Sequence, residues 1–175
     1  EIGAALTTLE ALGIDAIGLN CATGPAEMSE HLRYLAKHST LPVSVMPNAG
    51  LPILTGDGAY YPLAPDELAL AQAAFVREFG AGLVGGCCGT TPNHIKAIAE
   101  VVKNQTPKRP SFEPEPGLAS LYQLQPYDQT VTYFSIGERT NANGSKAFRE
   151  AMLSENWDEC IEIAKAQTRD GAHAL

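Results

Sequence analysis

Residues 81–95 read Ala81-Gly82-Leu83-Val84-Gly85-Gly86-Cys87-Cys88-Gly89-Thr90-Thr91-Pro92-Asn93-His94-Ile95. An apolar run of strand length ends in a glycine pair, two adjacent cysteines and a third glycine. A helical pattern follows, with Thr91 as the expected N-cap and Pro92 as the first helical residue. The buried stripe of this helix is expected at Ile95, Ile98, Ala99 and Val102. Strand, turn and helix in this order form the repeating unit of parallel α/β folds, so the stretch decides the fold class.

The same order occurs twice upstream. Residues 14–21 form an apolar run, followed by a turn and a helix that begins at Pro25. Residues 41–46 form another, followed by a long connection and a helix that begins near Pro65. Residues 1–12 are predicted as one more helix. Short apolar strands that alternate with helices predict a parallel sheet covered by helices. A (β/α)8 barrel takes roughly 250 residues, so these units are too few to close one, and an open doubly wound sheet stays an alternative.

Downstream of this segment the pattern lapses into prolines. Residues 105–127 include Thr106-Pro107-Lys108-Arg109-Pro110 and Glu113-Pro114-Glu115-Pro116, which favour extended backbone and predict a linker. A strand is then predicted over 130–136, a helix carrying Phe148, Met152 and Leu153 after it, and a second helix over 157–169. The second helix is expected to bury Trp157, Ile161 and Ala164, and residues 174–175 to begin another strand. The predicted division is therefore 1–104, 105–127 and 128–175.

Composition narrows the class of protein. A chain of 175 residues with 45% hydrophobic residues has enough apolar material for one or two folded domains. With 12 basic and 20 acidic side chains the net charge is -8, which disfavours binding to nucleic acid or to an anionic membrane surface. No apolar run reaches the roughly 18 residues of a spanning helix, and the first residues do not resemble a signal peptide. The 4 cysteines, two of them adjacent, do not suit a disulfide framework and indicate reduced thiols in a cytoplasmic protein.

Three of those cysteines follow predicted strands. Cys21 ends the first apolar run, and Cys87 and Cys88 end the third. Reactive groups in parallel α/β folds converge at the carboxyl ends of the strands, so the three thiols are expected at one opening. Three thiolates with one open position describe a catalytic zinc site, and soft thiolates select zinc over magnesium or calcium. The alternative is that they are core thiols, which is the reading we adopt for Cys160.

One further residue follows the second predicted strand. Asn48 lies in Met46-Pro47-Asn48-Ala49-Gly50 and so at the same mouth, although Asn-x-Gly is also ordinary turn chemistry. The histidines give weaker evidence for a metal site. His31, His38 and His94 are each expected to be surface or capping residues and not ligands.

Read together, Gly18-Leu19-Asn20-Cys21 and Gly85-Gly86-Cys87-Cys88-Gly89-Thr90-Thr91-Pro92 closely resemble the homocysteine S-methyltransferase family. The resemblance implies that residues 1–104 are the last three βα units of a (β/α)8 barrel that binds zinc and homocysteine. It implies Cys21, Cys87 and Cys88 as the zinc ligands, with the homocysteine sulfur in the open position. In the cobalamin-dependent members an Asn after the intermediate strand can occupy that position without substrate, and Asn48 is the matching residue.

The stretch Phe134-Ser135-Ile136-Gly137-Glu138-Arg139-Thr140-Asn141, followed by Gly144-Ser145, is similar to the opening of the pterin-binding domain of those cobalamin-dependent members. The resemblance implies that residues 128–175 begin a second (β/α)8 barrel, which binds methyltetrahydrofolate, with Glu138 and Asn141 at its folate-binding mouth. A simple pair of Glu138 with Arg139 at a strand end is the alternative. This chain departs from the family pattern at Ala142-Asn143, where the family usually has a longer hydrophobic or Val-Thr segment.

The resemblance implies transfer of a methyl group from methylcobalamin to homocysteine, with the cobalamin recharged by methyltetrahydrofolate. The partners are then homocysteine, methyltetrahydrofolate and a cobalamin-binding module of the same enzyme. Two alternatives stay open: another zinc-thiol or corrinoid/pterin methyltransferase, or a non-catalytic zinc-binding fragment. The isolated chain is expected to be inactive, since the residues that would clamp homocysteine and most of the pterin barrel are not among its residues.

Overall fold

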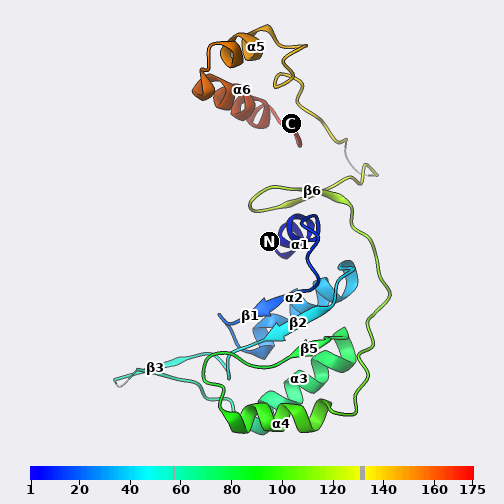
Figure 1. Ribbon diagram of the computed structural model, residues 1–175, viewed down its shortest axis with the longest axis vertical. Helices are drawn as coiled ribbons and strands as arrows, with labels where there is room; N and C mark the ends of the chain where they lie inside the picture. The colour runs from blue at the N-terminus through cyan, green and yellow to red at the C-terminus, as the bar shows by residue number, and fades with distance from the viewer. Residues whose placement is uncertain (57, 131–132) are drawn as a thin grey trace. The chain divides into compact units, whose positions relative to one another are not determined.

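The computed structural model describes residues 1–56, 58–130 and 133–175 (Figure 1). These residues form two compact units, the first made of residues 1–115 and 121–124 and the second of residues 116–120 and 125–175. None of the helices in the described ranges is both long enough and apolar enough to cross a membrane. In chain order the elements are α1 (Ile2–Glu10), β1 (Ile17–Asn20), α2 (Pro25–His38), β2 (Val43–Met46), β3 (Ile53–Thr55), β4 (Gly58–Tyr60), α3 (Pro65–Phe79), β5 (Leu83–Val84), α4 (Pro92–Val102), β6 (Gly117–Ala119), β7 (Leu124–Pro126), α5 (Lys146–Leu153) and α6 (Trp157–Arg169).

A parallel sheet of order β1-β2-β5 forms the centre of the first unit. Ile17 pairs with Val43 and Asn20 with Met46, while Val45 pairs with Val84, so the three strands run in step toward the same end. The next helix after β1 is α2 and after β5 is α4, while β2 leads to α3 through the β3–β4 segment. The predicted mixed α/β fold with a parallel sheet is therefore confirmed, and it is consistent with part of a barrel.

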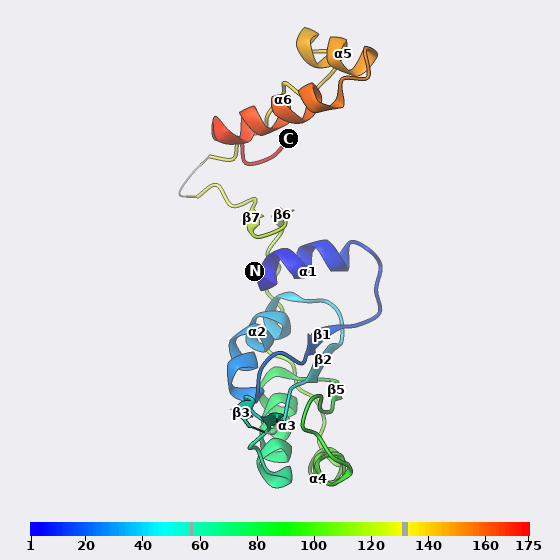
Figure 2. The same ribbon diagram turned by 90° about the vertical axis from the view of Figure 1, so that its left-hand side faces the viewer.

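The core of the first unit lies between this sheet and two of its helices. Figure 2 shows α2 and α3 on the same side of the three strands. Leu32 and Leu35 of α2 and Val43 and Val45 of β2 have no exposed surface, and Phe75 packs with them. The 3.6-residue repeat of α2 turns Met28, Leu32 and Leu35 toward the strands, as the sequence pattern predicts. Replacing one such leucine by alanine typically costs roughly 2–5 kcal/mol.

The third strand is shorter than the predicted apolar run. It ends at Val84. The Gly85 N–H still donates to the Val45 carbonyl of β2 at 3.2 Å, but the Gly85 carbonyl accepts a hydrogen bond from the buried Gln72 side chain at 2.5 Å. A β-carbon at Gly85 would lie 2.6 Å from the Met46 sulfur, so a larger residue here would require the Met46 side chain to move. The early end of β5 leaves residues 85–89 free to form the turn that carries both adjacent cysteines.

Helix α4 begins as predicted, with Thr91 as N-cap and Pro92 first, but the predicted buried stripe is wrong in part. Ile98 is 3% exposed, whereas Ile95 is 46% exposed and Ala99 is also exposed. The residue buried one turn before Ile98 is His94, which the helix turns inward. Periodicity alone predicts that the apolar Ile95 is buried. The hydrogen bonds of His94 instead rotate the buried face of α4 toward His94.

The connection after β2 contains an element that the sequence pattern does not predict. Strands β3 and β4 form an antiparallel hairpin in which Ile53 pairs with Tyr60 and Leu54 with Ala59. The side chains of both strands are exposed, so they lack the one-sided alternation that marks a strand packed on a core.

In the second unit, Ile136 forms an isolated parallel bridge with Ala174. The strand predicted over 130–136 is otherwise not present at residues 133–135, and residues 131–132 lie outside the described ranges. The prediction that α6 buries Trp157 and Ile161 is wrong, since these side chains are 56% and 50% exposed. The sequence pattern identifies the apolar face of α6, but no helix or strand of the described residues covers Trp157 and Ile161 on that face.

Candidate metal centre

The three predicted cysteines come together at the carboxyl ends of β1 and β5. The Cys21 and Cys88 sulfurs lie 3.6 Å apart and the Cys87 and Cys88 sulfurs 4.0 Å apart. All three sulfurs lie within 4.8 Å of one another. The parallel register of β1, β2 and β5 brings the turn after each strand to the same end of the sheet. Cys160, a free thiol on α6, is in the second unit.

The turn after β1 holds Cys21 in an unusual backbone conformation. Cys21 and Ala22 have φ values of 65° and 64°, in the left-handed region that non-glycine residues rarely adopt. The Cys21 N–H donates to the Met46 carbonyl at 2.9 Å, and the Thr23 N–H donates to the Cys21 carbonyl at 2.8 Å. Backbone strain of this kind clusters at functional sites, where the surrounding structure holds it in place.

The turn after β5 is fixed by the segment that follows β2. The Cys87 N–H donates to the Pro47 carbonyl at 2.8 Å, and the Ala49 N–H donates to the Cys88 carbonyl at 2.9 Å. Gly89 then takes a φ of 77°, which permits the chain to reverse toward α4. Backbone hydrogen bonds therefore hold the turn that carries both adjacent cysteines.

Asn48 lies between the two cysteine turns and is only 3% exposed. Its Oδ1 accepts a hydrogen bond from the Cys88 N–H at 3.1 Å, and its own N–H donates to the Thr23 carbonyl at 3.0 Å. The Asn48 side chain also makes a small contribution to the lowered pKa of the Cys21 thiol. The turn chemistry expected of Asn-x-Gly is present too, since the Gly50 N–H donates to the Asn48 carbonyl at 2.7 Å.

The three thiols are not equivalent in charge. The Ala22 N–H, together with the Cys87 and Cys88 side chains, lowers the pKa of Cys21 below its ordinary value, because each stabilises a thiolate there. The neighbouring Cys21 sulfur, burial and Cys88 raise the pKa of Cys87. Cys21 is therefore the first of this pair to lose its proton as the pH rises.

The donor set fits a zinc ion. Zinc–sulfur bonds of about 2.3 Å place the sulfurs of a tetrahedral site about 3.8 Å apart, close to the two shorter separations here. Three cysteines also leave one of four positions for another ligand, which is the pattern of catalytic zinc sites. Among the described residues, this is the group of side chains whose donor atoms lie close enough together to hold a metal ion.

Sequence reasoning missed Tyr61, which lies beside Cys88. A β-carbon at Gly89 would collide with the Tyr61 side chain, so the ring lies directly on the cysteine turn. The neighbouring Cys88 side chain, together with burial, raises the pKa of Tyr61 above its ordinary value. No spacing in the sequence indicates this contact, because Tyr61 lies in the long connection after β2.

His94 is a capping residue, as expected, and has a second role. Its Nδ1 accepts from the Thr91 N–H at 3.2 Å and lies 2.8 Å from the Thr91 hydroxyl. Its Nε2 lies 3.0 Å from the Leu63 carbonyl, so the tautomer with a proton on Nε2 satisfies both contacts. His94 thereby ties the start of α4 to the connection that carries Tyr61.

Glu138 and Asn141 lie in the second unit. The Asn141 Nδ2 donates to Glu138 Oε2 at 3.1 Å. The alternative pair of Glu138 with Arg139 is not seen among the described ion pairs, because Arg139 pairs with Asp170 at 3.6 Å. A cavity of about 340 Å³ is lined by Glu138 and Arg139 together with Gln167, whose Oε1 accepts from the Arg139 N–H at 2.6 Å.

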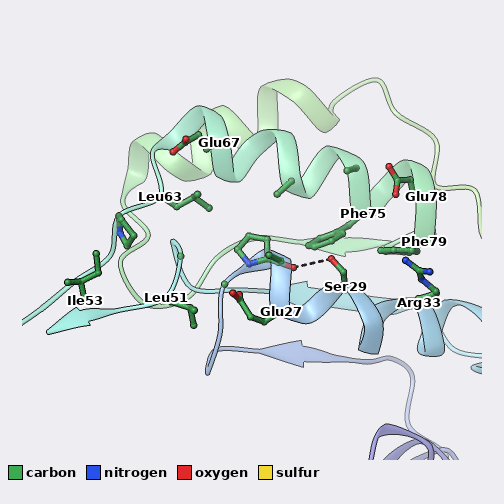
Figure 3. A pocket seen from close by; sticks show the side chains of 17 residues that line it. Glu27, Ser29, Arg33, Leu51, Ile53, Leu63, Glu67, Phe75, Glu78 and Phe79 are labelled. Atoms are coloured by element: carbon green, nitrogen blue, oxygen red, sulfur yellow. Dashed lines mark hydrogen bonds between the residues drawn. The ribbon is translucent and has the colours of Figure 1, made fainter.

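A second cavity, an apolar groove of about 700 Å³ between α2 and α3, contains none of the three clustered cysteines (Figure 3). Phe75 and Phe79, whose ring centroids lie 5.9 Å apart, line it together with Leu51 and Ile53. Glu27 and Glu78 lie at its rim. The metal-binding geometry and the larger cavity are therefore separate features of the first unit.

The sequence of this chain is similar to those of known proteins. The family model for homocysteine S-methyltransferase matches residues 1–102. The chain is 62% identical over 175 residues to the methionine synthase of Mycobacterium tuberculosis (strain ATCC 25618 / H37Rv), and 60% identical over 180 residues to that of Mycobacterium leprae (strain TN). Each alignment covers 100% of this chain and 15% of the relative. Because the family model covers more than half of its residues, including all three clustered cysteines, this chain belongs to the homocysteine S-methyltransferase family.

Proposed function

We propose that this chain supplies the metal centre of a methionine synthase, which transfers a methyl group from methylcobalamin to homocysteine. The observation that carries the proposal is the cluster of Cys21, Cys87 and Cys88 sulfurs within 4.8 Å of one another. The chain spans about 15% of the length of the two methionine synthases it matches. The cobalamin-binding module is therefore proposed to lie in other parts of such an enzyme.

Zinc bound by three thiolates would hold the homocysteine sulfur as a thiolate and keep it nucleophilic. Cys21, Cys87 and Cys88 are the residues that would bind it, and the turns around them set their directions. Asn48 is proposed to occupy the fourth position when substrate is absent. Its Oδ1 already accepts from the Cys88 N–H, so on this proposal the same amide would both hold the turn and bind the ion.

Residues 128–175 are proposed to begin a second barrel that binds methyltetrahydrofolate, which recharges the cobalamin. A pterin ring presents N–H donors that suit a carboxylate, and Glu138 offers one at the edge of a cavity. Asn141 would orient that carboxylate through its 3.1 Å hydrogen bond. On this proposal residues 1–104 are the last part of the zinc barrel and residues 105–127 the linker between the two barrels.

Free thiols support a reducing compartment, and we propose the cytoplasm. Cys21, Cys87, Cys88 and Cys160 are all free. Zinc–thiolate sites of this kind are lost when their cysteines are oxidised to disulfides.

The test is metal content. Cys21→Ala, Cys87→Ala and Cys88→Ala variants of the chain are each expected to lose zinc from about one ion per chain to nearly none. Cys160→Ala is the matched control and should retain it, because Cys160 lies in the other unit. In the intact enzyme the three variants should also lose homocysteine methylation. Undiminished zinc in all three would overturn the site assignment.

A non-catalytic zinc-binding role of the isolated chain is the second candidate, favoured by the small share of the relatives that the chain spans. The catalytic and the non-catalytic candidates differ in whether methionine is formed when homocysteine and methylcobalamin are supplied. We expect none from the isolated chain and full turnover from the intact enzyme. Another corrinoid or pterin methyltransferase with a different thiol acceptor would be recognised by its preference among thiol substrates.

A further inference from the structure

Gln72 of α3 is a polar side chain on the apolar face of its helix. It has no exposed surface, and it lies on the same face as Leu68 and Val76, which are also buried. Its Nε2 donates to the Gly85 carbonyl at 2.5 Å and, more weakly, to the Val45 carbonyl at 3.4 Å. Its Oε1 has no hydrogen-bond partner among the residues that the structure describes. Burying an amide with an unpaired oxygen costs free energy, so the packing of α3 alone does not explain a glutamine here.

The Gly85 carbonyl needs this donor because of the residue opposite it. Val45 of β2 pairs with Val84 of β5, and the Gly85 N–H donates to the Val45 carbonyl at 3.2 Å. In a parallel ladder the next hydrogen bond would run back from the N–H of residue 47 to the Gly85 carbonyl. Residue 47 is Pro47, which has no N–H. The Gln72 amide therefore supplies the hydrogen bond that the proline cannot form.

The pairing of the two segments continues past this point to a proposed metal ligand. The Cys87 N–H donates to the Pro47 carbonyl at 2.8 Å, which is the hydrogen bond expected one step further along the ladder. The Gln72 donor thus stands between two backbone hydrogen bonds, where the ladder would otherwise be interrupted. Without this donor a buried carbonyl would be left unpaired, and the chain just before Cys87 would be free to move away from Pro47.

We propose that Gln72 is a positioning residue of the metal centre: its amide replaces the backbone hydrogen bond that Pro47 cannot form and so holds Cys87 in register with the segment after β2. The inference rests on the proposed function, in which Cys87 binds zinc. Gln72 is not a ligand in this proposal. It acts through the backbone on the direction of a ligand, as the outer partners of metal ligands do.

The experiment is a double-mutant cycle on zinc affinity, measured in the full chain by chelator competition. Gln72→Met fills a similar volume but has no donor, and it should lower the affinity roughly tenfold. On a Pro47→Ala background, residue 47 regains an N–H that can donate to Gly85, so the same replacement should cost about threefold or less. Recovery through a backbone N–H on another element is a result that general loosening of the core does not give.

Val76→Ala is the matched control. Val76 is buried one helical turn further along α3, and its hydrogen-bonding groups are not part of the ladder. Its variant should lower the urea midpoint of the first unit, because it leaves a cavity, and should leave the zinc affinity of the folded chain unchanged.

The outcomes separate this inference from the proposed function. Wild-type affinity in Gln72→Met, an equal loss on both backgrounds, or the same loss in Val76→Ala overturns the inference, while zinc lost from Cys87→Ala leaves the proposed function standing. If Gln72→Met does not fold, the double variant decides: a folded, zinc-binding chain with Pro47→Ala and Gln72→Met supports the inference, and an unfolded one overturns it. A wild-type chain that binds no zinc overturns both proposals.

Discussion

Two adjacent left-handed residues, Cys21 and Ala22, set the electrostatics of the cysteine cluster. Their backbone turn points the Ala22 N–H at the Cys21 sulfur, and this contact is the largest cause of the lowered pKa of that thiol. The same sulfur is the largest cause of the raised pKa of Cys87, because a protonated Cys87 thiol donates a hydrogen bond to it, and repulsion between the two thiolates adds to the shift. A metal ion removes this conflict, since its charge stabilises all the thiolates together.

The order of these pKa values predicts the order of alkylation in the metal-free chain. At neutral pH, iodoacetamide should modify Cys21 before Cys87, because only the thiolate reacts and Cys21 ionises at lower pH. Peptide mass spectrometry after short exposures measures the two rates. The difference should narrow as the pH rises through the ordinary value of 9.0 for a cysteine, and bound zinc should protect both residues. Faster modification of Cys87 at neutral pH would contradict the assignment.

At the scale of elements, the C-terminal end of α2 depends on a residue far along the chain. The Arg109 guanidinium donates to the carbonyls of Ser39 at 2.6 Å and Leu41 at 3.0 Å, and more weakly to those of Leu35 and Ala36. These carbonyls end a helix and lead into β2, and a cation there also suits the helix dipole. Gly80, with a φ of 65°, makes room for Arg109, since a β-carbon there would lie 2.5 Å from its Cγ.

An Arg109→Ala variant is therefore expected to lower the free energy of unfolding of the first unit by about 2–3 kcal/mol, because buried carbonyls lose a charged donor. Urea denaturation followed by far-UV circular dichroism measures the change. Lys108→Ala, at an exposed neighbouring position, is the matched control and should stay within about 0.5 kcal/mol of the wild type. An equal effect of both variants would mean that Arg109 contributes only its charge.

The three strand-turn-helix units could be predicted from the sequence because their signals are local. Apolar runs, Pro25, Pro65 and Pro92 at helix starts, and cysteines at strand ends each depend on a few neighbouring residues. The contact of Arg109 with the end of α2 and that of Tyr61 with Gly89 could not be predicted. Each joins two segments that only the fold brings together. The buried faces of α4 and α6 differ from prediction for a related reason: periodicity identifies an apolar face but not the element that covers it.

At the scale of the whole molecule, the chain consists of two compact units, and the clustered cysteines all belong to the first. The single tryptophan, Trp157, belongs to the second, where it is 56% exposed at the start of α6. Each unit therefore carries its own reporter, metal content for the first and tryptophan fluorescence for the second.

Zinc should stabilise the first unit and leave the second unchanged. A ligand that binds only the folded state adds RT ln(1 + [L]/Kd), which is about 2.7 kcal/mol at a free zinc concentration of 100 times the Kd. Far-UV circular dichroism should show a transition at higher urea with zinc than with a chelator, while the midpoint followed by Trp157 fluorescence should stay the same. In Cys88→Ala neither transition should respond, since the site has lost a ligand. A Trp157 midpoint that shifts with zinc in the wild type would show that the two units unfold as one, and the metal centre would then stabilise the whole chain.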